Sequence, residues 1–458
     1  MIIDEILNYL SNRSDYCDVR YMETENNSMA YKNGEFMGID FSKDQGYAIR
    51  CVNNSIAMGF VSTENFDNAK GVIDNILKKS LLKGKNRINK NGNIKYSWSK
   101  TGIKKVENVS DNDKISFLSD NDKLMESLDA RIRINHLSDE RVKQIYKNSY
   151  GSDIRSEYSR IFYVYMLGVI EDNEFEQSFE EYGATTGYEY FDSIDLNDDI
   201  KNDIKSLKKS IKAKHIQPGN YDLIAGPEVS GIVAHESCGH PMEYDRIIGR
   251  ESAQAGGSFI KPDNYPLKVG SDIVNVVDDP TMHDSYGYYL YDDEGTKARK
   301  RELYKNGYTN EFILNRESAA ISNSEPNGGG RSSSWDMEPL ARMSTTYIEP
   351  KDYKFDELIE DIKHGIYMKN FTEWNIDDVR FNEKYVGKEA YLIENGEIKE
   401  QIRRPVLETN TVKFYSSIDA IGNDLRFNAG TCGKGDPEQG VEVWMGGPHI
   451  RLKNVFMK

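Results

Sequence analysis

The chain has 458 residues and a formal net charge of −16 at pH 7. This length predicts two or three domains with ample hydrophobic core. The negative charge argues against nucleic acid or an anionic membrane as the main partner, because both require a basic surface. The best apolar run, residues 161–170, is long enough for a strand but too short to span a bilayer.

The N-terminus and the cysteines favour a cytoplasmic location. Residues 1–16 are acidic and amphipathic and lack the basic and apolar regions of a signal peptide. The four cysteines have no regular spacing, so they predict no disulfide framework. We therefore expect a soluble cytoplasmic protein with reduced thiols.

Residues 1–90 are predicted to form an N-terminal α+β domain. An opening helix has one apolar face, formed by Ile2, Ile3, Ile6, Leu7 and Leu10. Strand-like segments then alternate with Asn- and Gly-bearing turns at 17–24, 28–41, 46–52 and 55–62, and a second helix is expected around 64–81. Residues 82–110 are polar and rich in lysine, which is typical of a solvated linker; their few aromatics argue against a nucleic-acid patch.

Residues 110–215 are predicted to form a middle, strand-rich region with a closing helix. A helix is expected near 112–128, and a charged helix around 195–214 carries Ile200, Ile204, Leu207 and Ile211 on one face. We place the main boundary near residue 216, before a Pro-Gly turn and a short buried strand at 221–225. A C-terminal domain, 216–458, then includes a helix near 355–364.

The sequence HESCGH, residues 235–240, sets two histidines around a glutamate. Pro227 begins a helix that leads into it. Two imidazoles and a carboxylate on one helix are the components of a zinc hydrolase site. The histidines are five residues apart, which on a straight α-helix puts them about 140° apart. Because they could not then bind one ion, we predict an irregular turn at Ser237–Gly239, such as a π-bulge. The alternative reading is a chance pairing of two histidines with a glutamate.

A catalytic zinc usually has three protein ligands and one position for water. The remaining candidates are any acidic residue, the other cysteines, and His136, His215, His283, His364 and His449. We favour Cys432 because its flanking glycines let the backbone approach a site closely, and because Lys434 would favour the thiolate. A small buried hydrophobe is the alternative reading of a lone cysteine. Glu243 or Asp245 is expected to orient a ligand histidine.

These residues predict amide hydrolysis, most naturally of a peptide bond. Zinc lowers the pKa of its water, Glu236 accepts the proton as general base, and the hydroxide attacks a polarised carbonyl. Arg331, in the Gly-Ser loop 327–334, is a candidate for binding a substrate carboxylate; a flexible surface loop is the alternative. Peptides are expected to bind extended against an open sheet edge.

Two other functions fit the same motif. One is a regulatory or interaction protein with a structural zinc site, which would need a fourth ligand such as Cys238 or a nearby acid. The other is a hydrolase of small amides. The fold class expected in each case is α+β: an N-terminal antiparallel sheet with helices, followed by a strand-rich C-terminal domain that carries the metal-binding helix.

The sequence resembles the TldD/PmbA family, in its TldD-like, metal-bearing branch, over nearly the whole chain. The segments that carry the resemblance are HESCGHPMEYD at 235–245, YDDEGTKARKRELYKNG at 291–307, GGGRSSSWDMEPLARMSTTYI at 328–348 and GTCGKGDPEQGVEVWMGGPHIRL at 430–452. Cys238 inside the motif and Asp-Pro-Glu at 436–438 depart from the family pattern.

The resemblance implies a zinc metallopeptidase of the HExxxH type. Its ligands would be His235, His240 and Cys432, and its catalytic base would be Glu236. The resemblance also implies a homodimer, or a heterodimer with a metal-free PmbA/TldE-like paralogue, in which the active site is enclosed between subunits. Unfolded proteins or short peptides would then be the substrates.

Overall fold

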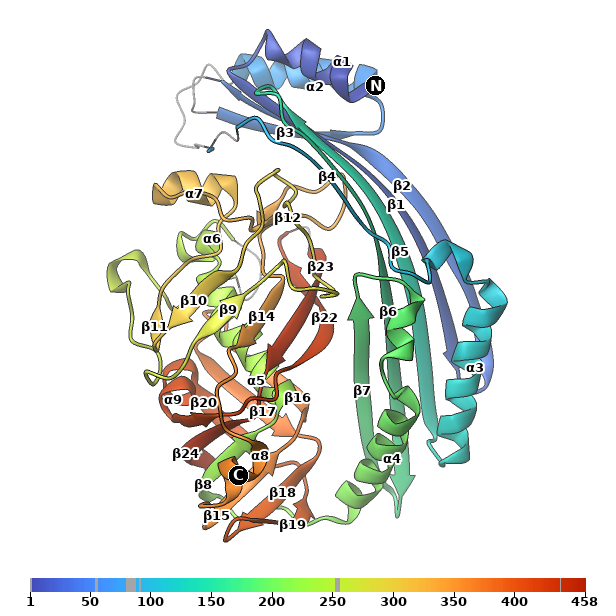
Figure 1. Ribbon diagram of the computed structural model, residues 1–458, viewed down its shortest axis with the longest axis vertical. Helices are drawn as coiled ribbons and strands as arrows, with labels where there is room; N and C mark the ends of the chain where they lie inside the picture. The colour runs from blue at the N-terminus through green and yellow to red at the C-terminus, as the bar shows by residue number, and fades with distance from the viewer. Residues whose placement is uncertain (1, 54–56, 80–87, 90–91, 252–255, 437) are drawn as a thin grey trace.

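The computed structural model describes all residues except 1, 54–56, 80–87, 90–91, 252–255 and 437. It consists of a long curved sheet with four helices and, beside it, a strand-rich C-terminal part (Figure 1). The predicted α+β class is therefore confirmed. Within the described residues, no helix combines the length and the apolar composition needed to cross a membrane.

The long sheet has the strand order β3-β2-β1-β5-β6-β4, with β7 paired to β6. Its strands are β1 (Tyr16–Lys32), β2 (Glu35–Asn53), β3 (Ala57–Thr63), β4 (Lys95–Lys100), β5 (Ile132–Asn148), β6 (Asp153–Glu171) and β7 (Glu174–Ala184). The predicted strand segments at 17–24, 28–41 and 46–52 merge into the long hairpin β1–β2. Its turn is Asn33–Gly34, where both residues have positive φ (47° and 88°), as a two-residue hairpin turn requires. One sheet thus contains strands from both predicted regions, 1–90 and 110–215; the domain boundaries stay a prediction.

Four helices pack on this sheet. They are α1 (Ile2–Ser11), α2 (Phe66–Lys79), α3 (Asp111–Ser127) and α4 (Leu196–Lys212), close to the predicted ranges. The apolar face predicted for α4 is buried, with Ile200, Ile204, Leu207 and Ile211 packed in one core cluster. Helical spacing identified this face because residues three and four apart lie on the same side of a helix.

The predicted linker, 82–110, contains a strand that the sequence analysis missed. β4 pairs in parallel with β6, and Trp98 of β4 stacks on Tyr158 with ring centroids 5.5 Å apart. The aromatic residues at alternate positions in KYSWSK (95–100) form a pattern too short to be recognised as a strand among the surrounding lysines and asparagines. Residues 80–87 and 90–91 of this segment lie outside the described residues.

The C-terminal part contains two large sheets. One has the order β11-β10-β9-β14-β23-β22, and the other has the order β16-β17-β20-β24-β8-β15-β18-β19 with β21 on β24. The strands of the first are β9 (Val276–Asp278), β10 (Arg301–Lys305), β11 (Tyr308–Thr309), β14 (Thr345–Ile348), β22 (Arg426–Lys434) and β23 (Gln439–Gly447). Those of the second are β8 (Gly219–Ala225), β15 (His364–Met368), β16 (Phe371–Ile376), β17 (Asn382–Gly387), β18 (Ala390–Glu394), β19 (Glu397–Ile402), β20 (Val406–Asn410), β21 (Ile418–Ile421) and β24 (Ile450–Met457).

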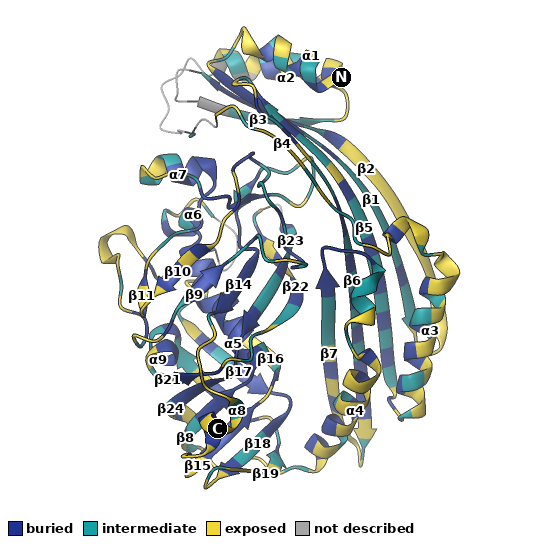
Figure 2. Ribbon diagram, in the orientation of Figure 1, coloured by how far each residue is buried: buried dark blue, intermediate teal, exposed yellow. Residues whose placement is uncertain are grey.

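Short elements complete this part: the ribbon β12 (Gly330–Arg331) with β13 (Leu340–Ala341), and the helices α5 (Pro227–Val233), α6 (Tyr244–Ile247), α7 (Arg316–Ser322), α8 (Phe355–Ile359) and α9 (Thr411–Ser416). The helix predicted near 355–364 is therefore shorter than expected and is followed by β15. The largest apolar core lies here and includes Val229, Ile232 and Val233 of α5. Figure 2 shows α5 and β14 as buried elements in the middle of this part.

Buried ion pairs join the long sheet to the C-terminal part. Arg316 of α7 donates to Asp18 of β1 at 2.7 Å, and Arg50 of β2 donates to the same carboxylate at 2.8 Å. Arg50 also pairs with Glu294 of the C-terminal part. Because a buried charge is costly unless it is paired, these contacts favour one relative placement of the two parts.

Candidate metal centre

The segment around HESCGH folds as an α-helix that widens into a π-helix. Strand β8 ends at Ala225, Gly226 is the N-cap of α5, and Pro227 occupies the first turn as predicted. Residues Ala234–Gly239 then form the π-helix, which confirms the predicted irregular turn. Because a π-turn bonds to the fifth residue along, it brings His235 and His240 to the same side, with ring centroids 4.9 Å apart.

Close packing holds the π-turn in place. A Cβ atom on Gly239 would lie 1.7 Å from the Sδ of Met343, so the chain needs glycine at this approach. The Ser237 hydroxyl donates to the carbonyl of Val233 at 2.8 Å, and the Tyr304 hydroxyl donates to the carbonyl of Ser237 at 3.0 Å. These hydrogen bonds satisfy two carbonyls at the irregular turn.

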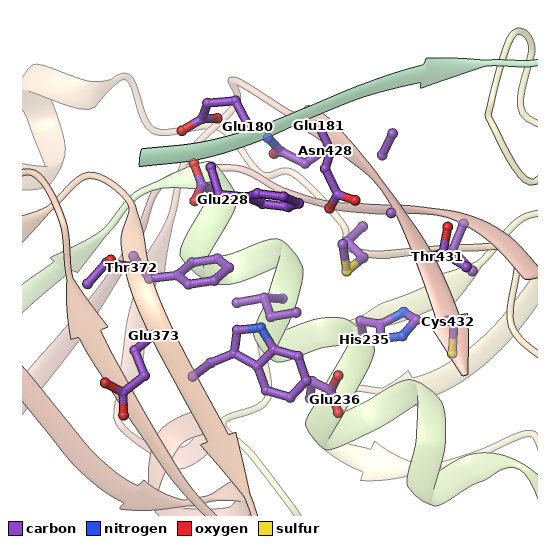
Figure 3. Close-up of a pocket in the computed structure, with 18 of the residues that line it drawn as sticks. Glu180, Glu181, Glu228, His235, Glu236, Thr372, Glu373, Asn428, Thr431 and Cys432 are labelled. Atoms are coloured by element: carbon purple, nitrogen blue, oxygen red, sulfur yellow. The ribbon is translucent and has the colours of Figure 1, made fainter. Parts of the chain in front are cut away.

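The structure brings Cys432 to the two histidines. Cys432 lies on β22, which pairs with β23, the strand against which α5 packs. One ligand atom each from His235, His240 and Cys432 lies within 4.8 Å of the others, and all three residues are buried. Figure 3 shows His235 beside Cys432. The Cys432 Sγ is 3.5 Å from Nε2 of His240.

This cluster fits a zinc ion. A thiolate and an imidazole bound tetrahedrally to zinc lie about 3.6 Å apart, which follows from bond lengths of about 2.3 and 2.1 Å. Among the described residues, the buried Nδ1 atom of His235 has no hydrogen-bond partner, so its lone pair is available to a cation. Two nitrogen donors and one sulfur donor are a set that zinc prefers.

The electrostatics of the cluster favour the ligand forms of its residues. Burial lowers the pKa of His235 and lowers that of His240 to about 4, which favours the neutral imidazole that binds a metal. Burial alone would raise the pKa of the Cys432 thiol, but His240 and the Arg342 guanidinium outweigh it and lower the pKa to about 7. Lys434, expected to act on this thiol, instead donates to Asp245 at 2.7 Å.

Glu243 orients His240. Its Oε2 atom lies 3.1 Å from Nδ1 of His240, which leaves Nε2 of the ring facing Cys432. The same carboxylate oxygen accepts from Arg246 at 2.6 Å and from Lys434 at 3.1 Å. Burial would raise the pKa of Glu243, yet these cations hold it well below its usual range. Of the two acids expected to orient a ligand, Glu243 is the one that contacts it.

A cavity of about 590 Å³ opens onto the cluster, within the range typical of ligand sites. It lies between β7 of the long sheet and the C-terminal part, and β16 and β22 form further walls. Glu236 lines the cavity, and the Arg380 guanidinium donates to its carboxylate. Aromatic and acidic side chains, including Trp374, line the rest. Figure 3 shows Glu181 and Glu228 among them.

The remaining candidates lie away from this cluster. Arg331 is buried, donates to the carbonyl of Met343 at 2.6 Å, and does not line the cavity. Its substrate-binding role stays a prediction. Cys238 is buried beside Tyr304, and burial raises the pKa of its thiol well above the usual value. Within the described ranges, the cluster of His235, His240 and Cys432 is the one group of its kind, and neither Cys238 nor any other histidine belongs to it.

Sequence reasoning missed Arg342 and Arg380. Arg342 donates to the backbone carbonyl of Cys432, and Arg380 contacts Glu236. Both are separated from their partners by 90 residues or more, and neither belongs to a local pattern with chemical meaning. No signal in the sequence points to either contact.

The site and the fold together define a candidate metal-dependent hydrolase, and comparison with known proteins gives its class. Family models match in three segments: PmbA/TldA metallopeptidase domain 1 at residues 17–80, the central domain at 104–212 and the C-terminal domain at 218–458. The chain therefore belongs to the PmbA/TldD metallopeptidase family.

Relatives and solved structures agree with this assignment. A metalloprotease from Methanothermobacter thermautotrophicus is 29% identical, over 99% of this chain and 98% of the relative. A zinc metalloprotease TldD homolog from Saccharolobus solfataricus is 28% identical, over 96% of each chain. The crystal structure of TldE from Thermococcus kodakarensis matches with a TM-score of 0.79 at 15% identity and covers 100% of both chains, which shows a shared fold.

Proposed function

We propose that this protein is a zinc-dependent peptidase that hydrolyses unfolded proteins or short peptides, with Glu236 as general base. The observation that carries the proposal is the convergence of His235, His240 and Cys432 at one end of a cavity that Glu236 also lines. Among the described residues three ligands meet, not four, and a site with an open fourth position is typical of catalytic rather than structural zinc.

A bound zinc ion would supply a Lewis acid that polarises a carbonyl and lowers the pKa of water. Glu236 then accepts a proton from the attacking water and passes it to the leaving nitrogen as the C–N bond breaks. Glu243 holds His240 in the orientation that directs Nε2 toward Cys432.

Strand β16 suits the binding of extended peptides. It ends the strand order of its sheet, and within the described residues it pairs with β17 alone. Its residues Phe371–Trp374 line the cavity. A peptide added to this edge would gain main-chain hydrogen bonds with little dependence on side chains. An extended segment enters such a cavity most readily from an unfolded chain or a short peptide, so these are the substrates we infer.

Removal of metal tests the proposal. The purified protein should contain one zinc per chain and should cleave a reduced, denatured protein. A chelator should abolish cleavage, and one equivalent of zinc should restore it, as measured by metal analysis and peptide mass spectrometry. Cleavage by metal-free protein would overturn the proposal. Zinc without cleavage of proteins or peptides would favour a structural metal site, and cleavage of small amides alone would favour the small-amide hydrolase.

We also infer that a second subunit of the same family, either another copy of this chain or a metal-free PmbA/TldE-like paralogue, pairs with the outer edge of β2. Residues 35–46 of β2 pair with β1, while β3 begins its pairing at Tyr47, so among the described residues this edge has no other strand beside it. Met37, Ile39 and Phe41 are 59%, 47% and 64% exposed there (Figure 2). A long apolar edge strand left open promotes aggregation, so a partner is expected to cover it.

Sedimentation velocity tests the partner. The native chain should sediment as a dimer, and Phe41→Asp should sediment as a monomer with an unchanged circular dichroism spectrum. Phe456→Asp, which alters another exposed phenylalanine, is the matched control and should remain dimeric. A native monomer would exclude the homodimer.

All four cysteines are free thiols, which suits the cytoplasmic location that we propose.

A further inference from the structure

Arg380 is a buried cation beside the candidate general base. It is 8% exposed, lines the same cavity as the three ligand candidates, and donates through Nη1 to the carboxylate of Glu236. Lys388, the other cation that lines the described cavity, donates to Glu180 and, at 2.8 Å, to Ser178. Arg380 is therefore the cavity cation that is directed at Glu236.

The loop that carries Arg380 is held on several sides. Arg380 has φ of +62°, a left-handed conformation that is strained for a residue with a side chain. Its N–H donates to the carbonyl of Asp377 at 2.9 Å, and the Thr411 hydroxyl donates to its carbonyl at 3.1 Å. The backbone N–H of Phe259 donates to the carbonyl of Val379 at 2.8 Å. Strain that the surroundings hold in place is typical of functional positions.

The contact with Glu236 puts the guanidinium next to the reacting atoms. A general base must lie about 2.6–3.2 Å from the water whose proton it accepts, and that water attacks the scissile carbonyl carbon. A guanidinium hydrogen-bonded to Glu236 is therefore close to the carbonyl group that this water would attack. A guanidinium has five N–H donors in a planar fork, so it can bind a carboxylate and a second oxygen together.

We propose that Arg380 is a catalytic residue whose guanidinium donates a hydrogen bond to the oxyanion formed from the scissile carbonyl, while the same group holds Glu236 in position. The inference rests on the proposed peptidase function. As the water oxygen bonds to the carbonyl carbon, Glu236 takes one water proton and the carbonyl π electrons move onto oxygen. Arg380 stabilises that negative charge and keeps all its own protons. When the C–N bond breaks, the carbonyl re-forms and Glu236 gives its proton to the leaving nitrogen.

The test compares Arg380→Gln, Arg380→Lys and the matched control Arg404→Gln. Arg404 also has positive φ (45°) and pairs with a carboxylate, that of Glu176 at 3.2 Å, but lies outside the cavity. Five quantities are measured for each zinc-loaded protein: zinc content, melting temperature, kcat and KM for a peptide, and the calorimetric affinity for a phosphinic peptide. The phosphinic group is a tetrahedral anion that mimics the oxyanion, so its affinity reports on Arg380 without turnover.

Arg380→Gln should keep its zinc and lower kcat by about 10²-fold, with KM within about threefold, as loss of one oxyanion donor does. Its affinity for the phosphinic peptide should fall at least about tenfold. Arg380→Lys should recover part of the lost kcat and part of the lost affinity. Arg404→Gln should match the native protein in both. If Arg380→Gln does not fold, Arg380→Lys tests the inference instead. Its single ammonium cannot bind the carboxylate and the oxyanion together as the planar guanidinium does, so kcat should still fall about tenfold.

Three results would overturn the inference: an unchanged kcat, a raised KM at unchanged kcat, or loss of zinc in both Arg380 variants. The second would indicate that Arg380 binds ground-state substrate, and the third that it supports the metal centre. If the native protein and its Arg380 variants cleave peptides at equal rates, the proposed function stands and this inference alone is removed. A native protein that neither holds zinc nor cleaves would remove both.

Discussion

Glu236→Gln is expected to lower kcat for peptide hydrolysis by about 10²–10⁴-fold while one zinc per chain is retained. Glutamine has the shape of glutamate but cannot accept the proton of the attacking water. Glu236 is not one of the three residues whose ligand atoms converge, so its neutralisation should leave metal binding in place. Steady-state kinetics on a peptide substrate, together with metal analysis of the same preparation, measure both quantities.

Glu383→Gln is the matched control for this substitution. Glu383 is buried close to the π-turn but does not line the cavity. Burial raises the pKa of its carboxyl to about 8, so the group is protonated at pH 7 and glutamine resembles it. The control should keep kcat within about threefold of the native value. Equal activity of Glu236→Gln and native protein would remove Glu236 from the mechanism and would favour a structural role for the metal.

Cys432→Ser is expected to weaken zinc binding by about 10²–10³-fold. Zinc binding by four protein ligands is worth about 10–16 kcal/mol, or about 2.5–4 kcal/mol per ligand, and a neutral hydroxyl is a poor substitute for a thiolate. The thiol of Cys432 has a pKa of about 7, so it supplies the charged form readily near neutral pH. Competition with a chromophoric chelator measures the affinity.

Cys238→Ser is the control, because Cys238 lies in the same motif but outside the ligand group. It should keep native zinc affinity, although a hydroxyl at this buried position will lower the melting temperature somewhat. Native affinity in Cys432→Ser would contradict the assignment of Cys432 as a ligand. Loss of zinc in Cys238→Ser, with Cys432→Ser unaffected, would point to a different ligand set.

Local patterns in the sequence predicted the elements and the chemistry that depend on near neighbours. The apolar face of α4 follows from residues three and four apart, and the π-turn follows from two histidines five apart that must face one ion. The motifs also carried a family resemblance, which the family comparison confirms. Such features are readable because the interacting residues lie within a few positions of one another.

Only the tertiary structure decided which distant residues meet. Cys432 and His240 are 192 residues apart, and their contact depends on the register of β22 on β23 and on the packing of α5 against that sheet. The partner of Lys434 and the placement of Arg380 on Glu236, 144 residues away, likewise depend on how separate elements dock. Periodicity and spacing report the local backbone conformation and the buried face of each element, but a contact between elements is set by the packing of the whole core, which no short stretch of sequence contains.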